Sequence, residues 1–105
     1  MKRIAVCGSN VTNSNNVIKV SEEIGEEIAK RKDILVCGGL GGVMEAAARG
    51  CKKLNGMTVG ILPSSDPSSA NDYIDIALPT SLGKFRNFLI VHSVDGVIAI
   101  EGKWG

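Results

Sequence analysis

The stretch that decides the fold is ILVCGGLGGVMEAAARG, residues 34–50. It opens with β-forming apolar residues that favour a buried strand, and it ends in an alanine-rich run that favours a helix. Four glycines stand between them within five positions. Such a turn is either tightly packed or approached closely by another group, because glycine has no side chain to obstruct it. The free N–H groups at the start of the helix favour an anion, most often a phosphate.

The same alternation of apolar strand and helix extends in both directions along the chain. The predicted strands are Arg3–Gly8 and residues 33–39, 57–63, 73–78 and 95–100, and the predicted helices span residues 17–30, 42–56 and 81–93, with an exposed loop at residues 64–72. Apolar strands that alternate with helices indicate a parallel sheet covered on both faces. We therefore expect α/β architecture, a Rossmann-like three-layer α/β/α fold with a mainly parallel sheet in one domain, residues 1–105.

Individual residues indicate where the predicted helices begin, end and pack. An Asn or Ser within residues 13–16 is expected to cap the first helix. Gly25, inside that helix, is expected to mark close packing on the sheet, and Gly56 is expected to end the second helix.

Composition excludes several kinds of partner. The chain has 105 residues with a net charge of +1 and 4% aromatic residues, so neither a basic surface nor a stacking platform for nucleic acid is expected. No apolar run approaches the ~20 residues that span a bilayer, and the N-terminus does not resemble a signal peptide. We therefore expect no membrane partner, and nucleic acid is disfavoured.

The cysteines indicate a reducing compartment. The three cysteines, Cys7, Cys37 and Cys51, form no CxxC pair, which fits a cytoplasmic protein. Cys7 and Cys37 each precede a glycine at the end of a predicted strand, so their sulfurs could lie close enough for a metal or redox role. We favour the alternative that both are small buried hydrophobic residues, and we expect no metal site.

Three glycine-containing turns follow predicted strands, at residues 7–10, 37–44 and 101–105. In a doubly wound sheet, ligands bind outside the carboxyl ends of the strands. The second turn is not a Walker A loop, because no Lys-Ser or Lys-Thr follows its glycines. It is also a poor dinucleotide fingerprint, since Met44 stands where the third glycine belongs. A nicotinamide-dependent enzyme is therefore not expected.

Taken in order, CGGLGGVMEAAARG, VGILP and FRNFLIVHSVDGVIAIEGKWG resemble the Lonely Guy and lysine-decarboxylase-like (SLOG) superfamily over essentially the whole chain. This superfamily includes nucleoside 5′-monophosphate phosphoribohydrolases, molybdenum-cofactor carrier proteins and relatives of the DNA-processing protein A. The GGVMEAAARG and RN variants are most similar to the molybdenum-cofactor-carrier branch. The hydrolase branch usually has a glycine where this chain has Glu45.

The resemblance implies a set of ligand-contacting positions. The early turns and the late turn together hold a phosphate in the superfamily, and an arginine before the fifth strand assists glycosidic cleavage in the hydrolases. In this chain the implied phosphate- or ligand-binding residues are Gly8, Ser9, Gly38, Gly39, Gly41, Gly42, Val43, Met44, Arg86, Asn87, Gly102 and Gly105. Arg86 would be catalytic only in a hydrolase, and Asn87 either bonds a ligand or caps the turn.

Single residues near the predicted site carry weaker expectations. His92, the only histidine, is expected on a helix face rather than as a base. Glu45, one turn into the second helix, offsets the helix dipole but would repel a phosphate placed too near it.

The late turn departs from the superfamily pattern. Glu101 and Lys103 replace residues that are commonly proline or glycine, and the chain stops where a threonine and the catalytic glutamate should follow. We therefore expect a domain that is incomplete at its C-terminus. A fifth strand with no helix after it would leave apolar surface uncovered, and this predicts a homo-oligomer.

The sequence is compatible with two functions. The first is binding of a small phosphorylated ligand, a nucleoside monophosphate or a pterin-type compound such as the molybdenum cofactor, with no cofactor required. The alternative is a phosphoribohydrolase, if the chain continues into the missing glutamate. DNA handling is disfavoured by the absence of basic excess.

Overall fold

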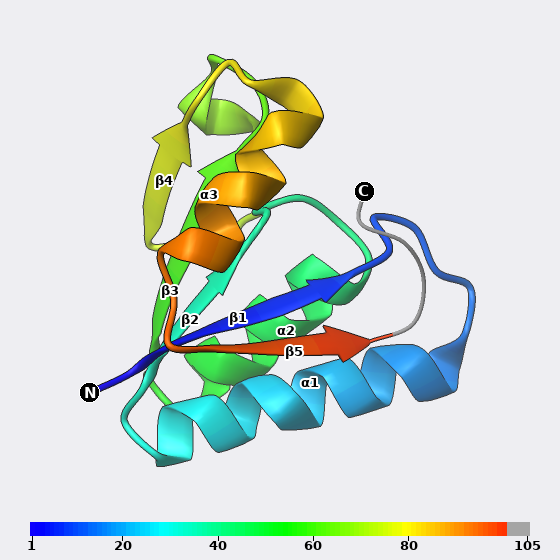
Figure 1. Cartoon of the computed structure of the whole chain (residues 1–105). Helices are drawn as coiled ribbons and strands as arrows, with labels where there is room; N and C mark the ends of the chain where they lie inside the picture. The colour runs from blue at the N-terminus through cyan, green and yellow to red at the C-terminus, as the bar shows by residue number, and fades with distance from the viewer. Residues whose placement is uncertain (101–105) are drawn as a thin grey trace.

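Five parallel strands form the central sheet of the computed structural model, which describes residues 1–100 (Figure 1). The strands are β1 (Arg3–Gly8), β2 (Ile34–Cys37), β3 (Met57–Leu62), β4 (Ile76–Pro79) and β5 (Gly96–Ile100), in the spatial order β4-β3-β2-β1-β5. The helices are α1 (Asn15–Lys30), α2 (Val43–Lys53) and α3 (Arg86–His92), with short 3₁₀ turns η1 (Pro67–Ser69) and η2 (Gly83–Phe85). All pairings are parallel, so the predicted α/β architecture is confirmed.

The helices divide between the two faces of the sheet. Helices α1 and α2 pack against one face, where Val6, Leu35 and Ala47 belong to one buried cluster. Helix α3 lies on the other face, where Ile90 packs with Ala5 and other strand residues (Figure 1). The chain builds the sheet from β1 outward to β4 and then returns to place β5 beside β1. Strand order therefore reverses between β1 and β5, which is where ligands bind in such sheets.

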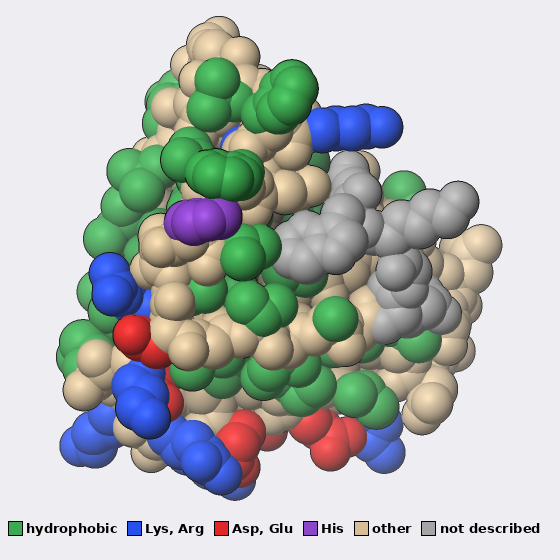
Figure 2. Space-filling model, in the orientation of Figure 1, with side chains coloured by type: hydrophobic (Ala, Val, Ile, Leu, Met, Phe, Trp, Pro, Cys, Tyr) green, Lys and Arg blue, Asp and Glu red, His purple; other side chains and the backbone are tan. Residues whose placement is uncertain are grey.

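Helix α1 begins as the sequence predicts. The Val17 N–H donates to the Ser14 hydroxyl at 3.2 Å, and Ser14 is the N-cap. Charged side chains of both signs line the outer side of α1, as Figure 2 shows. The predicted contact of Gly25 with the sheet is wrong. A Cβ there would overlap the carbonyl of Ala47, so Gly25 lets α1 approach α2 instead.

The end of α2 also differs from the prediction. The helix ends at Lys53, and Asn55 rather than Gly56 takes the left-handed conformation, with φ 60°. Gly56 is required for another reason, because a Cβ there would lie 2.8 Å from the Cβ of Ala29. Gly56 also helps to end the helix, because its N–H donates to the Cys51 carbonyl at 3.0 Å.

Cys7 and Cys37 lie on opposite faces of the sheet. Cys37 belongs to the core under α1 and α2, whereas Cys7 packs against the core under α3. Burial raises the pKa of the Cys37 thiol to about 12 and that of Cys51 to about 11. All three cysteines are free, and residues 1–100 contain no cluster of side chains that could hold a metal ion. They are small packing residues, and the sulfur–sulfur approach considered for the sequence does not occur.

The last predicted helix is shorter than expected. Residues 81–93 were expected to be helical throughout, but Ser81 and Gly83 have φ of 60° and 58°, so only η2 and α3 form. No helix within residues 1–100 combines the length and apolar composition needed to span a lipid bilayer.

Candidate functional site

The glycine-rich turn between β2 and α2 is crowded by the loop that follows β1. The Val43 N–H donates to the Ser9 carbonyl at 3.0 Å, and the Gly41 N–H donates to the Asn10 side-chain oxygen at 2.8 Å. Gly42 has φ 60°, and a Cβ there would lie 2.6 Å from the Asn10 carbonyl. Gly41 and Gly42 therefore admit another stretch of the protein's own backbone.

The first two glycines of the turn have separate roles. Gly39 has φ 78°, and a Cβ on it would lie 2.5 Å from the Leu62 side chain, so it fits against β3. Gly38 leaves room for a cation instead. A Cβ on Gly38 would overlap the Nη2 atom of Arg86 and lie 2.7 Å from the Met44 sulfur. The missing side chain at position 38 thus creates the space that the Arg86 guanidinium occupies.

Arg86 is buried at the start of α3, with 3% of its surface exposed. Its Nε donates to the Ile61 carbonyl at 2.9 Å, and Nη1 donates to the Asn87 side-chain oxygen. No carboxylate pairs with it among residues 1–100, and Nη2 has no hydrogen-bond acceptor there. Burial lowers the pKa of this guanidinium. A buried cation without a counter-charge is costly, and a bound anion would relieve that cost.

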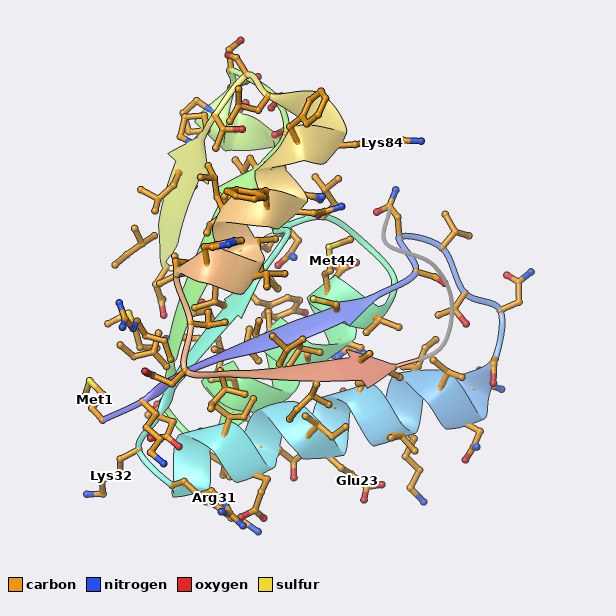
Figure 3. The ribbon with its side chains drawn as sticks, in the orientation of Figure 1. Met1, Glu23, Arg31, Lys32, Met44 and Lys84 are labelled. Atoms are coloured by element: carbon orange, nitrogen blue, oxygen red, sulfur yellow. The ribbon has the colours of Figure 1, made fainter. Side chains whose placement is uncertain are left out.

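A hollow opens beside this guanidinium at the carboxyl ends of β1 and β2. Its lining is Val6, Cys7, Gly8, Gly38, Met44, Arg86, Asn87 and Ile90. Figure 3 shows Met44 at the start of α2, on the edge of the sheet where these strands end. The backbone N–H groups of Met44 and Glu45 have no acceptor within residues 1–100, as is usual for the first turn of a helix. Two sources of positive potential therefore meet at the hollow, the Arg86 guanidinium and the N-terminus of α2.

The structure brings together part of the predicted site. Five predicted residues line the hollow, namely Gly8, Gly38, Met44, Arg86 and Asn87. Another five do not line it: Ser9, Gly41, Gly42 and Val43 lie where the first loop packs on the turn, and Gly39 lies against β3. The predicted contacts of Gly102 and Gly105, with their neighbours Glu101 and Lys103, fall outside the described residues.

Two further residues contribute that the sequence reasoning did not single out. Asn10 supplies the side-chain oxygen that accepts from Gly41, and Ile61 supplies the carbonyl that orients Arg86. Asn10 is the last residue of the predicted turn at residues 7–10, so the sequence could have indicated its side chain, whereas no sequence signal marks a backbone carbonyl of β3.

Glu45 lies away from the hollow. It lines a separate groove on the α1 side of the turn, together with Asn10 and Arg49. The repulsion of a phosphate expected from this carboxylate therefore does not apply directly at Arg86. No Asp or Glu of residues 1–100 therefore lines the hollow.

Comparison with known proteins places the chain in a family. The model of the SLOG cluster4 family matches residues 1–105. The chain belongs to the SLOG cluster4 family. The superfamily membership inferred from the sequence motifs is thereby confirmed.

Individual members of this wider group are similar in sequence and structure. An uncharacterised protein of Archaeoglobus fulgidus is 44% identical over 87 residues, which are 83% of this chain and 57% of that protein. The molybdenum cofactor binding protein of Rippkaea orientalis superposes with a TM-score of 0.93 at 39% identity, over 97% of this chain and 63% of that one. The molybdenum cofactor carrier protein of Chlamydomonas reinhardtii gives 0.87 at 30% identity, over 98% and 64%.

A more distant match concerns the fold alone. The DNA processing protein A of Helicobacter pylori superposes with a TM-score of 0.71 at 19% identity, over 93% of this chain and 53% of that one. Against each of these four proteins, the SLOG chain spans less than two thirds of the relative's length.

Proposed function

We propose that this SLOG protein binds a small phosphorylated ligand of the pterin or nucleotide class over the mouth of the hollow beside Arg86, with the molybdenum cofactor as the first candidate. The hollow itself measures about 20 Å³, so only part of the anionic group enters it and the rest of the ligand lies outside. The observation that carries the proposal is the state of Arg86. Its guanidinium is buried, has no carboxylate partner in residues 1–100, and keeps Nη2 without an acceptor there. An anionic ligand supplies the missing counter-charge.

The residues around Arg86 fit a phosphate group. Arg86 offers charge-assisted hydrogen bonds, which are roughly twice as strong as neutral ones. Met44, at the start of α2, lines the hollow, so the positive end of the α2 dipole lies close to it. Asn87 orients the guanidinium through its side-chain oxygen and also lines the hollow.

The choice of ligand class is supported by the relatives. The Rippkaea and Chlamydomonas proteins are molybdenum cofactor binding and carrier proteins, at 39% and 30% identity to this chain. The molybdenum cofactor is a pterin that carries a phosphate, so it shares the anionic group with nucleoside monophosphates. If it binds, it does so as cargo, and the residues of this chain hold and shield it.

The phosphoribohydrolase alternative lacks support from the described residues. Cleavage by that mechanism needs a carboxylate beside the sugar, and no Asp or Glu of residues 1–100 lines the hollow.

Titration calorimetry with matched ligands tests the proposal. GMP and guanosine differ only in the phosphate, and molybdenum cofactor released from a purified molybdoenzyme is the third probe. We expect GMP or the cofactor to bind, and guanosine to bind at least about tenfold more weakly than GMP, since one charge-assisted hydrogen bond contributes about 1.5–3 kcal/mol. Equal affinity for GMP and guanosine would contradict phosphate recognition. Absence of heat with all three probes would overturn the proposal.

A further inference from the structure

The loop that follows β3 reaches back to the glycine-rich turn through one residue, Asn71. Its backbone N–H donates to the Gly39 carbonyl at 2.9 Å, and its side-chain Nδ2 donates to the Leu40 carbonyl at 2.7 Å. The side-chain oxygen accepts from the Tyr73 N–H at 2.9 Å, which fixes the orientation of the amide. Asn71 therefore holds two consecutive carbonyl groups of the turn with a side chain that is itself held in place.

The turn is thus fastened from two sides by different groups. The loop after β1 accepts from the N–H groups of Gly41 and Val43, as described above. Asn71 instead donates to the carbonyl groups earlier in the turn, which lie nearer to β2. The sequence marks residues 64–72 only as an exposed loop, yet Asn71 is partly buried in the structure. Its contacts with residues about 30 positions earlier carry no local signal.

The segment that Asn71 holds rests directly on β3. A Cβ built on Gly60 would lie 3.1 Å from the Gly39 Cα, and a Cβ built on Gly39 would lie 3.3 Å from the Gly60 Cα. The two backbones approach this closely because neither residue has a side chain. Asn71 lies in the loop that leaves β3 and bonds to the turn, so its hydrogen bonds favour this contact between turn and strand.

The contact between Gly39 and Gly60 sets the width of the gap that the Arg86 guanidinium occupies. Gly38, the neighbour of Gly39, forms one wall, since a Cβ there would lie 2.9 Å from the Arg86 Cζ. Ile61, the neighbour of Gly60, supplies the carbonyl that accepts from Nε at 2.9 Å. Loosening the turn from β3 would therefore widen the gap and free the guanidinium to reorient.

We propose that Asn71 is a positioning residue, which keeps the Arg86 guanidinium in one orientation by holding the glycine-rich turn against β3. Asn71 does not line the hollow, so it acts through the turn and not by touching a ligand. The positioning of Arg86 is a property of the ligand-free protein. Its consequence for ligand affinity rests on the proposed function.

Two substitutions at position 71 separate the contacts of the side chain. Asn71→Ala removes both side-chain hydrogen bonds, to Leu40 and from Tyr73, and leaves the backbone N–H that donates to Gly39. Asn71→Asp keeps the acceptor for Tyr73 but has no donor for the Leu40 carbonyl. Because aspartate has nearly the same shape as asparagine, this variant keeps the test open if Asn71→Ala does not fold.

Ser69→Ala is the matched control. The Ser69 hydroxyl also makes two side-chain hydrogen bonds in the same loop, with the Ser64 hydroxyl at 2.9 Å and to the Asp66 carbonyl at 2.8 Å. Neither bond reaches the glycine-rich turn. Like Asn71→Ala, the control removes a neutral polar side chain, so it reports the effect of loosening the loop alone.

Hydrogen exchange of the Arg86 Nε–H, followed by ¹H–¹⁵N NMR without ligand, measures the positioning directly. We expect a slowly exchanging Nε–H in the wild type and in Ser69→Ala, because it is buried and bonded to the Ile61 carbonyl. In both Asn71 variants, exchange should be at least about fivefold faster, since one lost hydrogen bond is worth about 1 kcal/mol. Unchanged exchange in both variants would overturn the proposal. Equal acceleration in Ser69→Ala would overturn it too, by showing only a general loosening of the loop.

Calorimetry with GMP and guanosine then tests the consequence for the ligand. The preference for GMP should fall at least about fivefold in Asn71→Ala and stay at the wild-type value in Ser69→Ala. A full preference retained in Asn71→Ala would refute a role of Asn71 at the ligand site. A wild-type protein with equal affinity for both compounds would contradict the proposed function alone, because the exchange measurement decides the role of Asn71 without a ligand.

Discussion

Replacing Arg86 with methionine separates a ligand-binding role from a structural one. Methionine retains an unbranched apolar stem but has no charge and no donor. Nε of Arg86 donates to the Ile61 carbonyl, and Nη1 donates to the side-chain oxygen of Asn87. The substitution therefore removes two internal hydrogen bonds and one buried cation that has no carboxylate partner within residues 1–100.

The two effects on stability oppose each other. Leaving the Ile61 carbonyl without its donor costs about 1–3 kcal/mol. Removing a buried, uncompensated charge returns a desolvation penalty of several kcal/mol. We expect the free energy of unfolding of Arg86→Met to stay within about 1 kcal/mol of the wild type or to rise. Ligand affinity should fall about ten- to 150-fold, because each charge-assisted hydrogen bond to the phosphate contributes about 1.5–3 kcal/mol.

Urea unfolding and calorimetry with GMP or the molybdenum cofactor measure the two quantities on the same preparation. Arg31→Met is the control, since Arg31 is exposed at the end of α1 and pairs only with Glu27. The reasoning is refuted if Arg86→Met binds the ligand as tightly as the wild type. It is also refuted if the variant loses about 3–5 kcal/mol of stability, the usual result of breaking a buried ionic network.

Three further substitutions test individual contacts. Gly42→Ala should cost at least about 2 kcal/mol more than Gly83→Ala in urea unfolding, because φ is 60° and 58° respectively but only at Gly42 would the Cβ meet backbone atoms. Equal costs would show that the turn is not crowded. Gly38→Ala should change stability by less than about 1 kcal/mol, since its Cβ meets flexible side-chain ends, yet weaken ligand binding about tenfold by displacing Arg86. Unchanged affinity in calorimetry would contradict this. Burial raises the pKa of Cys37 from 9.0 to about 12, so the stability that its protonated thiol contributes is complete below pH 9 and is lost as the pH rises toward 12. The loss reaches at most about 1.4 kcal/mol per pH unit, and Cys37→Ala should flatten the stability profile between pH 8 and 10.5.

The glycine-rich turn was predictable because its residues carry strong local signals. Four glycines between an apolar strand and an alanine-rich helix indicate a special backbone, and the predicted turn forms there. The individual roles of those glycines were not predictable. Gly42 admits the backbone of the loop after β1, while Gly38 makes room for a side chain from α3, nearly fifty residues further along the chain. Such roles depend on contacts between distant segments, which no local pattern records.

By itself, the sequence determined the alternation of strands and helices, the parallel sheet and the family, because apolar runs, capping residues and motif order are local properties. The tertiary structure alone decided that Arg86 is buried without a carboxylate partner in residues 1–100, that Cys7 and Cys37 face opposite sides of the sheet, and that Phe88 points outward. These outcomes depend on which face each crossover covers and on how far a seven-residue helix can shield five strands. Which side chains become buried is decided by contacts between elements that lie far apart in the sequence.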